Sequence, residues 1–328
     1  MTDLLERIGL EHPVVQAGMG GGVAGGELAG AVSAAGGLGT VGIMAPRPFR
    51  AALGDAKRRA RGRPVAANLL VPFTRPAHVA ACVDAGAALV VLHGGFAPRA
   101  VARLRARGVP VFVTVGSAEQ ARGALAGGAE GLVAQGLESG GHLVADRPLA
   151  DVLPQVLEVA DGKPVLAAGG VADASDVRRL VDAGATAAVA GTRFLLTRES
   201  GAHEAYQQRV LSAGRTLVTL LFGVGWPLRH RVVPNAATER WCRPTDLGPR
   251  WLRSLAQLSA PLGRALPLGA TTAMVALQHR AVPLFSPGLP LAGMPADTVD
   301  SAALYAGDTA QRMHDVIPAA EAVRLLTR

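Results

Sequence analysis

Cysteine is nearly absent from this sequence of 328 residues, which contains only Cys82 and Cys242. Two thiols so far apart argue against a disulfide scaffold and a cysteine-based metal cluster, so we expect no metal site. Apolar runs long enough to span a membrane are also lacking. The first residues, MTDLLERIGLEHP, carry acidic side chains and no apolar stretch typical of a secretory signal. These absences predict a cytoplasmic protein without a membrane partner.

Lysine and aromatic residues are scarce as well. Lysine occurs only at Lys57 and Lys163, aromatic residues make up 4% of the chain, and arginine supplies most of the positive charge behind the net +8. The arginines are dispersed apart from one cluster at residues 58–63, and neither a zinc-ligand spacing nor an aromatic RNA-binding motif occurs. We therefore expect no nucleic-acid partner, and we interpret the basic balance as a field that attracts small anionic ligands.

Glycine, in contrast, is abundant, with 41 residues, and it separates short apolar runs from alanine-rich runs. The apolar runs are continuous rather than alternating, which is typical of parallel strands buried on both faces. Several alanine-rich runs begin at Ser, Asp or Pro and end at Gly, as helices do. The predicted strands are 13–17, 38–42, 65–70, 88–93, 109–115, 131–135, 164–169 and 187–192, and the clearest helices are 26–36, 97–108, 117–128 and 173–184.

Eight successive strand–helix units predict an α/β fold of the (β/α)8 TIM-barrel type. A doubly wound parallel sheet is the alternative. The glycine-rich dinucleotide signature of such sheets matches at residues 20–25, but no acidic residue follows the second strand, which leads to Pro46. We therefore reject a dinucleotide-binding interpretation.

The sequence changes in character at about residue 200. Segments 215–242 and 247–280 combine prolines and basic residues with helical patterns and hold all three tryptophans. We interpret them as an additional, mostly helical module, and segment 307–326 predicts a last pair of helices. The predicted domains are 1–200 for the barrel, 201–290 for the helical module and 291–328 for helices that return to the barrel.

In such a barrel the functional groups follow the strands, because the strand-to-helix loops converge at one end. Glycines after the seventh and eighth strands leave main-chain N–H groups accessible, and a following helix adds partial positive charge, which suits a phosphate. The alternative is that these glycines serve only turns. The residues that end or follow the strands are Gly18, Met19, Asn68, His93, Gln135, Gly136, Ala168, Gly169, Gly170, Gly191 and Thr192.

His142 is the candidate catalytic residue. It ends the stretch VAQGLESGGH, in which Gly140 and Gly141 let the chain pass close to a ligand. An imidazole near its ordinary pKa suits a general base at neutral pH, whereas the alternative is a surface or capping histidine. For His93, a role toward substrate and a hydrogen-bonded structural role both stay open. We interpret Glu138 as a cap or turn residue.

Six stretches in this order resemble the nitronate monooxygenases, formerly called 2-nitropropane dioxygenases. The similarity is strong over residues 12–210 and weaker beyond them. The stretches are PVVQAGMGGGVAGGELAGAVSAAGGLGTVG, NLLVP, VVLHGGF, VAQGLESGGH, PVLAAGGVAD and AGTRFLLTRESGAHEAY.

The resemblance implies a TIM barrel with a helical substrate lid and noncovalently bound FMN. It implies oxidation of alkyl nitronates, and of neutral nitroalkanes, by O2 to a carbonyl compound and nitrite. In that reaction His142 abstracts the proton α to the nitro group or orients the nitronate, and His93 is a substrate-binding residue. The expected partners are therefore this small-molecule substrate and O2.

The resemblance also implies, by position, which residues bind the cofactor. The expected isoalloxazine contacts are Met19, Asn68 and Gln135; the expected phosphate contacts are Gly169, Gly170, Gly191 and Thr192; and Gly18, Gly136, Gly141 and Ala168 complete the set. Gly18 departs from the family pattern, which usually has proline here, so we expect a more flexible loop beside the flavin.

Other functions fit the same scaffold. One is an NAD(P)H-dependent flavin reductase that acts on quinones or on enoyl thioesters, although HGG after the fourth strand and AQG after the sixth favour the monooxygenase over the enoyl reductase. Outside enzymes, the alternative is a non-catalytic flavin-binding protein, against which His142 argues. The lid region matches the family poorly, so the substrate is unconstrained, and a homodimer is left open.

Overall fold

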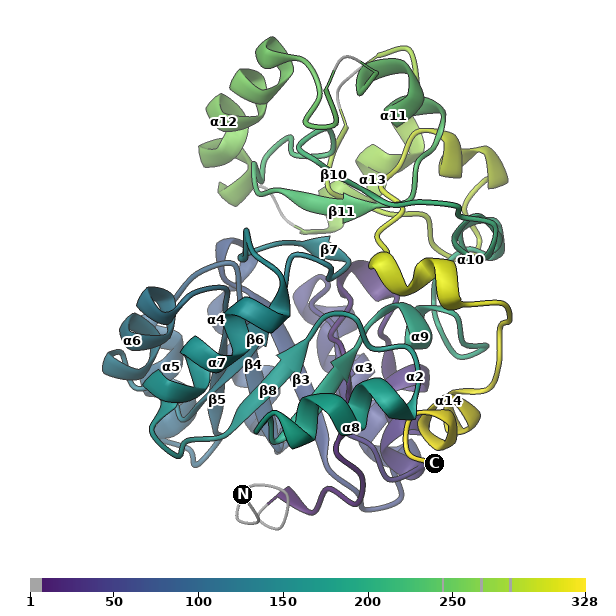
Figure 1. The fold of residues 1–328 in the computed structure, drawn as a ribbon. Helices are drawn as coiled ribbons and strands as arrows, with labels where there is room; N and C mark the ends of the chain where they lie inside the picture. The colour runs from purple at the N-terminus through teal and green to yellow at the C-terminus, as the bar shows by residue number, and fades with distance from the viewer. Residues whose placement is uncertain (1–7, 244, 266–267, 283–284) are drawn as a thin grey trace.

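The computed structural model describes residues 8–243, 245–265, 268–282 and 285–328. The expectation about the N-terminal segment falls partly on residues 1–7, outside these ranges. Within them, the chain forms a lower part built of strands and helices in alternation and an upper part formed by residues from about 203 to 313, and the C-terminal residues return to the lower part (Figure 1).

Eight parallel strands form a near-closed barrel in the order β1-β9-β8-β6-β5-β4-β3-β2. The two end strands meet, because Gln16 N donates to Leu38 O at 2.9 Å and Leu38 N donates to Val14 O at 2.9 Å. This closure confirms the predicted barrel and excludes the doubly wound sheet, which has two free edges. The strands, each inside its predicted range, are β1 (Val14–Gln16), β2 (Gly39–Val41), β3 (Val65–Leu70), β4 (Leu89–His93), β5 (Val111–Val115), β6 (Gly131–Gln135), β8 (Val165–Ala168) and β9 (Ala187–Ala190).

Helices follow the strands and surround them (Figure 1). Local capping explains several helix starts: Ser117 Oγ accepts from Gln120 N at 3.2 Å, and Asp173 Oδ1 accepts from Ser175 N at 2.8 Å. The helices of the barrel are α2 (Gly26–Ala34), α3 (Pro46–Arg59), α4 (Pro76–Asp84), α5 (Pro98–Arg105), α6 (Ala118–Ala126), α7 (Leu149–Ala160), α8 (Ala174–Asp182), α9 (Thr192–Leu195) and the returning α14 (Ala319–Leu325), with 3-10 turns at Gly20–Gly22 and Val71–Phe73.

Apolar side chains fill the interior of the barrel and form the floor on which the functional site lies. Phe112 is fully buried at this level, and Gly131 on the neighbouring strand makes room for its ring, since a Cβ at Gly131 would lie 2.3 Å from Phe112 Cζ. Side chains from most of the strands complete this cluster, including Val15, Ala66, Val91, Val133, Leu166 and Ala187.

Segment 203–313 lies over the carboxyl ends of the barrel strands (Figure 1). The prediction of helix across 215–242 is wrong for two stretches, which form a pair of antiparallel strands, and the second of them also pairs with a two-residue strand in a barrel loop. The predicted pair of helices in 307–326 is one 3-10 turn followed by α14. The elements are α10 (Glu204–Leu211), β10 (Leu217–Thr219), β11 (His230–Val232), α11 (Ala236–Trp241), α12 (Arg250–Ala265), α13 (Leu268–Leu277), the 3-10 turns Ala296–Asp300 and Asp308–Arg312, and the loop strand β7 (Gly141–His142).

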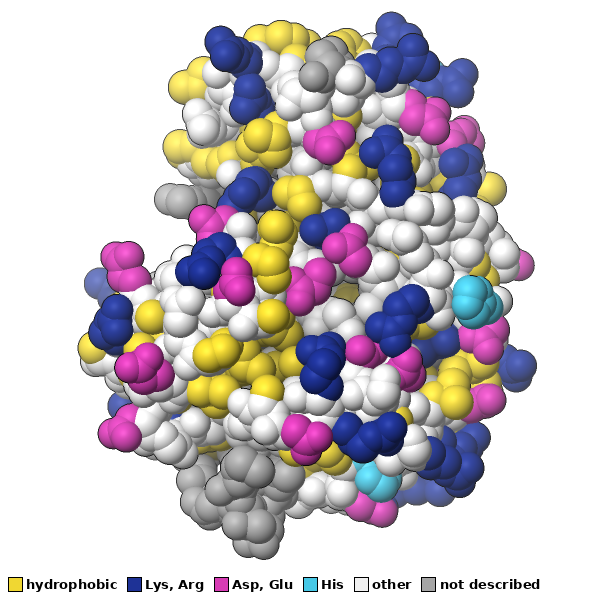
Figure 2. Space-filling model, viewed as in Figure 1, with side chains coloured by type: hydrophobic (Ala, Val, Ile, Leu, Met, Phe, Trp, Pro, Cys, Tyr) yellow, Lys and Arg dark blue, Asp and Glu magenta, His cyan; other side chains and the backbone are white. Residues whose placement is uncertain are grey.

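Positive charge is concentrated in residues 215–280 of this segment. Residues 215–280 contain nine arginines against only Glu239 and Asp246, so most of the net charge of +8 belongs to one fifth of the chain. Figure 2 shows Lys and Arg side chains around the upper part of the visible face. Among the described residues, we find no helix with the length and apolar character needed to cross a bilayer.

Candidate active site

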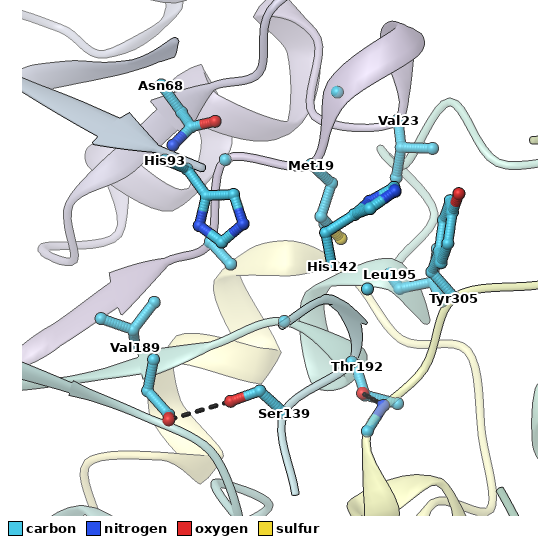
Figure 3. A pocket seen from close by; sticks show the side chains of 18 of the residues that line it. Met19, Val23, Asn68, His93, Ser139, His142, Val189, Thr192, Leu195 and Tyr305 are labelled. Carbon is cyan, nitrogen blue, oxygen red and sulfur yellow. Dashed lines mark hydrogen bonds between the residues drawn. The ribbon is translucent and has the colours of Figure 1, made fainter. Parts of the chain in front are cut away.

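A cavity opens at the carboxyl ends of the strands, between the barrel and residues 226–309. We call it the barrel-top cavity (Figure 3). Of the site residues predicted from the sequence, only Gly136 does not line it. Those that do are Gly18, Met19, Asn68, His93, Gln135, Gly141, His142, Ala168, Gly169, Gly170, Gly191 and Thr192.

The loop after β6 carries His142 into the cavity and is held from both sides. Gln135 Nε2 donates to His142 O at 3.1 Å, and Gln135 Oε1 accepts from Val144 N at 2.8 Å. On the other side β7 pairs with β11, so that His142 lies directly across from His230. The amide of Gln135 therefore fixes the loop that presents the histidine.

The two glycines before His142 have separate structural reasons. A Cβ at Gly140 would lie 2.5 Å from Gly307 N, so this position allows the segment 306–307 to cross the loop closely. Gly141 has φ of +76°, a left-handed conformation that favours glycine. Together they turn the chain so that the next side chain points into the cavity.

Aromatic rings surround the imidazole of His142. The indole of Trp226 stacks on it, with ring centroids 3.7 Å apart and planes inclined by 18°, while the rings of His230 and Tyr305 each lie 5.2 Å away. The Nε2 atom of His142 is buried and has no hydrogen-bond partner among the described residues. Burial, followed by the neighbouring His230 and His93, holds the pKa of His142 well below its ordinary value, so the ring is neutral at pH 7.

The other two histidines are neutral as well. Burial lowers the pKa of His93 to about 4, against a hydrogen bond with the main chain of His142 that raises it. Burial likewise lowers the pKa of His230 to about 4. The His230 ring bonds Leu228 O through Nδ1 at 3.0 Å and accepts from Phe222 N through Nε2 at 3.3 Å, which sets one tautomer. Both roles left open for His93, toward the substrate and as a hydrogen-bonded structural residue, stay predictions.

Glycines at the ends of β8 and β9 form the opposite end of the cavity. The main-chain N–H groups of residues 170, 191 and 192 lie here and take part in no turn or loop bond to another main-chain group in the described part of the chain, whereas the pairing of Ala168 with Val189 directs Gly169 N toward the sheet. Thr192 Oγ1 accepts from Gly307 N at 3.0 Å, which leaves its hydroxyl proton free to donate. Nearby, Ser139 Oγ donates to Ala168 O at 2.9 Å (Figure 3). This end therefore offers several donors to an anion.

Gly18 and Asn68 contact each other so closely that no side chain fits at position 18. A Cβ there would lie 2.1 Å from Asn68 Cβ. The Nδ2 of Asn68 donates to Val91 O at 3.4 Å, whereas its Oδ1 is buried without a partner among the described residues, as is Oγ1 of the adjacent Thr40. Two residues that line the same cavity thus each have a buried oxygen without a partner in the described part of the chain.

Gly136 and Glu138 have structural roles beside the cavity. Gly136 N donates to Ala168 O at 2.9 Å, and a Cβ at this position would lie 2.5 Å from Leu149 N, so Gly136 serves close packing. Both carboxylate oxygens of Glu138 accept from Leu149 N, at 3.2 and 3.1 Å, where α7 begins. Glu138, interpreted as a cap or turn residue, thus binds the first N–H of α7 from a loop 11 residues earlier in the chain.

Sequence reasoning missed the part of the site that comes from the upper segment. Trp226, His230 and Tyr305 all contact the ring of His142. The stretch around Trp226 matched the family only weakly, and no spacing connects these residues with a loop after β6. The only signal available was the concentration of tryptophans in a segment expected to cover the barrel.

The fold and the cavity define an α/β-barrel enzyme with its site at the strand ends. The chain belongs to the nitronate monooxygenase family, whose model matches residues 2–89 and 71–328. Members of this family are oxidoreductases and are generally flavin-dependent.

Individual relatives differ in their reactions. The (3aS,4S,5R,7aS)-5-hydroxy-7a-methyl-1-oxo-octahydro-1H-indene-4-carboxyl-CoA dehydrogenase of Mycobacterium tuberculosis is 36% identical over 256 residues, 73% of this chain and 68% of that protein. A nitronate monooxygenase of Pseudomonas aeruginosa is 31% identical over 271 residues, 67% of this chain and 77% of that protein. The structure of a nitroalkane oxidase from Streptomyces ansochromogenes is 28% identical with a TM-score of 0.75, covering 99% of this chain and 96% of that one. The names of these relatives refer to different substrates, so family membership alone does not identify the substrate of this protein.

Proposed function

We propose that this protein is an FMN-dependent oxidoreductase that oxidises alkyl nitronates with O2 to a carbonyl compound and nitrite. Family membership and the likeness to a nitronate monooxygenase and a nitroalkane oxidase support this substrate class. The observation that carries the proposal is the unpaired Nε2 of His142, buried in the same cavity as the unpaired oxygens of Asn68 and Thr40. Buried polar atoms without partners cost free energy unless a ligand pairs with them.

The residues of the cavity fit FMN. A flat, apolar ring system with polar edges suits a floor of barrel side chains next to the unpaired oxygens of Asn68 and Thr40. The N–H groups after β8 and β9, with the hydroxyl of Thr192, would hold the phosphate. Bound FMN supplies electron-transfer chemistry that no side chain of the protein provides.

His142 would act on the substrate through Nε2. Its neutral imidazole can accept a proton or hydrogen-bond to a substrate, but its lowered pKa makes it a weak base. A nitronate has already lost its α-proton, so it matches this histidine better than a neutral nitroalkane does. A bound anion would raise the pKa of His142 and strengthen its hydrogen bond to the substrate.

We further propose that residues 201–290 act as a substrate lid. The support is that β11 pairs with the loop that carries His142, and that Trp226 lies against the imidazole. A lid held in this way excludes water from the reacting atoms and limits what enters.

A second candidate is oxidation of an acyl-CoA ester. The 36% sequence identity to the CoA-ester dehydrogenase supports this candidate, and so does the excess of arginine in residues 215–280. CoA carries several phosphate charges, which a basic surface next to the cavity would attract. The same basic surface also attracts a small nitronate. Only a measurement of turnover with each substrate therefore distinguishes the two candidate functions.

The test compares electron donors on the purified, FMN-loaded protein. We expect nitrite release from propionate 3-nitronate and from simple alkyl nitronates in air, and bleaching of the flavin absorbance by a nitronate without air. Bleaching by NADPH, with quinone or enoyl-thioester reduction, would instead identify a reductase, and bleaching by an acyl-CoA would identify the second candidate. A protein that takes up FMN and responds to none of these donors would be a non-catalytic binder, and one that takes up no FMN would contradict the proposal outright.

A further inference from the structure

Trp226 occupies a built position inside the site. It lies in the connection between β10 and β11 and is only 7% exposed. Its backbone is fixed by a tight turn, in which Trp226 N donates to Gly223 O at 3.0 Å and Leu228 N donates to Trp226 O at 2.8 Å. The turn places the indole flat on His142, at 3.7 Å between ring centroids.

The barrel makes room for this indole. A Cβ at Gly94, which follows β4 and has φ of +75°, would lie 2.9 Å from Trp226 Cζ2. The ring of Phe73 meets the indole edge-on at 5.4 Å, and the ring of His93 does so at 6.4 Å. Loops after β3, β4 and β6 thus all contact one side chain of the upper segment.

We propose that Trp226 determines which substrates reach His142 and positions its ring. The indole covers one face of the imidazole, and Tyr305 and His230 lie around the rest of it, so a substrate can approach only at the Nε2 edge. The indole also takes the space that a branched or cyclic group on the reacting carbon would need. This inference rests on the proposed role of His142 toward the substrate.

The size of the effect follows from the space removed. An apolar pocket discriminates between two substrates that differ by one methylene group by about 10-fold to 200-fold. Replacing an indole with a methyl group removes far more than one methylene, although water will enter part of the space. We therefore expect Trp226→Ala to relax the preference for small substituents by at least about 10-fold, and Trp226→Phe to relax it less.

The first measurement is binding of carboxylates to the FMN-loaded enzyme. Carboxylates are planar anions like nitronates but are not oxidised, so their dissociation constants report binding without turnover, and the change in their ratio on substitution reports the space beside His142. Propanoate and cyclohexanecarboxylate are titrated against the flavin absorbance. We expect the wild type to prefer propanoate and Trp226→Ala to lose most of that preference, while Trp251→Ala, on the exposed tryptophan of α12, leaves it unchanged.

The second measurement is the NMR signal of the His142 ring protons, assigned with His142→Gln. A stacked indole shifts these protons upfield, so Trp226→Ala should move them downfield. Gly94→Ala should move them in the same direction, because the added methyl displaces the indole. Gly108→Ala is the matched control, since Gly108 has a similar φ of +68° and nothing within 4 Å of the added atom.

The outcomes separate this inference from the proposed function. An unchanged carboxylate preference and unchanged ring signals in both Trp226→Ala and Gly94→Ala would overturn the role of Trp226. If Trp226→Ala does not fold, Trp226→Phe and Gly94→Ala decide by the same two readouts. Absence of nitronate oxidation by the wild type would reject the proposed function, while the carboxylate preference and the ring signals would still decide the role of Trp226.

Discussion

The barrel and the segment 215–280 differ in charge and in how their strands are held. The segment has nine arginines against two acidic residues, whereas the rest of the chain is almost electrically balanced. Each barrel strand pairs with parallel neighbours in a near-closed circuit, whereas β10 and β11 form a small antiparallel sheet whose only strand pairing with the barrel, in the described part of the chain, is that of β11 with β7. The barrel therefore supplies a rigid floor, and the segment supplies a cover whose position depends on a few contacts.

His142 lies where the two regions meet. Gln135 of the barrel holds the main chain of this residue, while His230 and Trp226 of the segment hold its strand and its ring. Variants on either side can therefore show which region controls cofactor binding and which controls chemistry.

The largest effect is expected at the junction itself. His142→Ala should retain FMN, because the predicted phosphate and ring contacts lie elsewhere, but lose activity on neutral nitroalkanes by about 100-fold or more. Activity on nitronates should fall less, because no proton needs to be removed. Steady-state nitrite release checks this, with the exposed His314→Ala as control; nitroalkane activity equal to that of the wild type would refute the role of base.

The second effect is a fall in the free energy of unfolding at acid pH, and it arises from His230 on the cover. His230 is fully buried, and its native pKa of about 4 lies below the ordinary value of 6.5. The unfolded chain therefore binds a proton at higher pH than the native protein does, so the stabilisation present above pH 6.5 is lost as pH falls toward 4, by up to about 3 kcal/mol.

Urea unfolding of the FMN-free protein between pH 7.5 and 4.5 measures this loss. His230→Gln should flatten the dependence of the unfolding free energy on pH, and His314→Gln should not. An equal slope in the wild type and His230→Gln would show that His230 does not stay neutral in the native protein. The pKa of His93 in the barrel is also lowered by burial, so protonation of His93 likewise lowers the free energy of unfolding as the pH falls.

The third effect tests how the cover is attached. Arg231 on β11 donates to Leu137 O from Nε at 3.1 Å and from Nη2 at 2.9 Å, and its Nη1 lies 2.6 Å from Asp308 Oδ1. Its side chain is 11% exposed and that of Asp308 is 44% exposed. Arg231→Met removes these contacts and should cost about 2–3 kcal/mol of unfolding free energy, less than for a fully buried pair.

The matched control for Arg231→Met is Arg209→Met. Arg209 pairs with Asp300 at 2.9 Å on the surface, with side chains 44% and 34% exposed. Loss of this surface ion pair in Arg209→Met should lower the free energy of unfolding by less than about 1 kcal/mol. If thermal unfolding shows equal losses for the two variants, the junction at Arg231 does not hold the cover as proposed.

The difference between the regions also explains what could be predicted from sequence. The barrel was predictable because each strand is a continuous buried run and because residues such as Ser117 and Asp173 start helices locally. β10 and β11 were not, since they belong to no repeated strand–helix unit and their pairing with each other and with β7 depends on tertiary contacts. The glycines around the cavity follow strands and were predicted, whereas Trp226 reaches His142 through a turn that no local pattern indicates.

The smallest effect we expect belongs to the barrel alone, at Gly18. The resemblance to the family led us to expect a more flexible loop where proline is replaced by glycine, but the structure gives glycine a steric reason, since a Cβ would overlap Asn68 Cβ at 2.1 Å. Gly18→Ala must displace Asn68 and should weaken FMN binding about 10-fold, which equals about 1.4 kcal/mol. Gly123→Ala, with nothing within 4 Å, is the control. Equilibrium dialysis measures the FMN affinity of both variants. An unchanged affinity in Gly18→Ala would mean that Asn68 does not contact the cofactor.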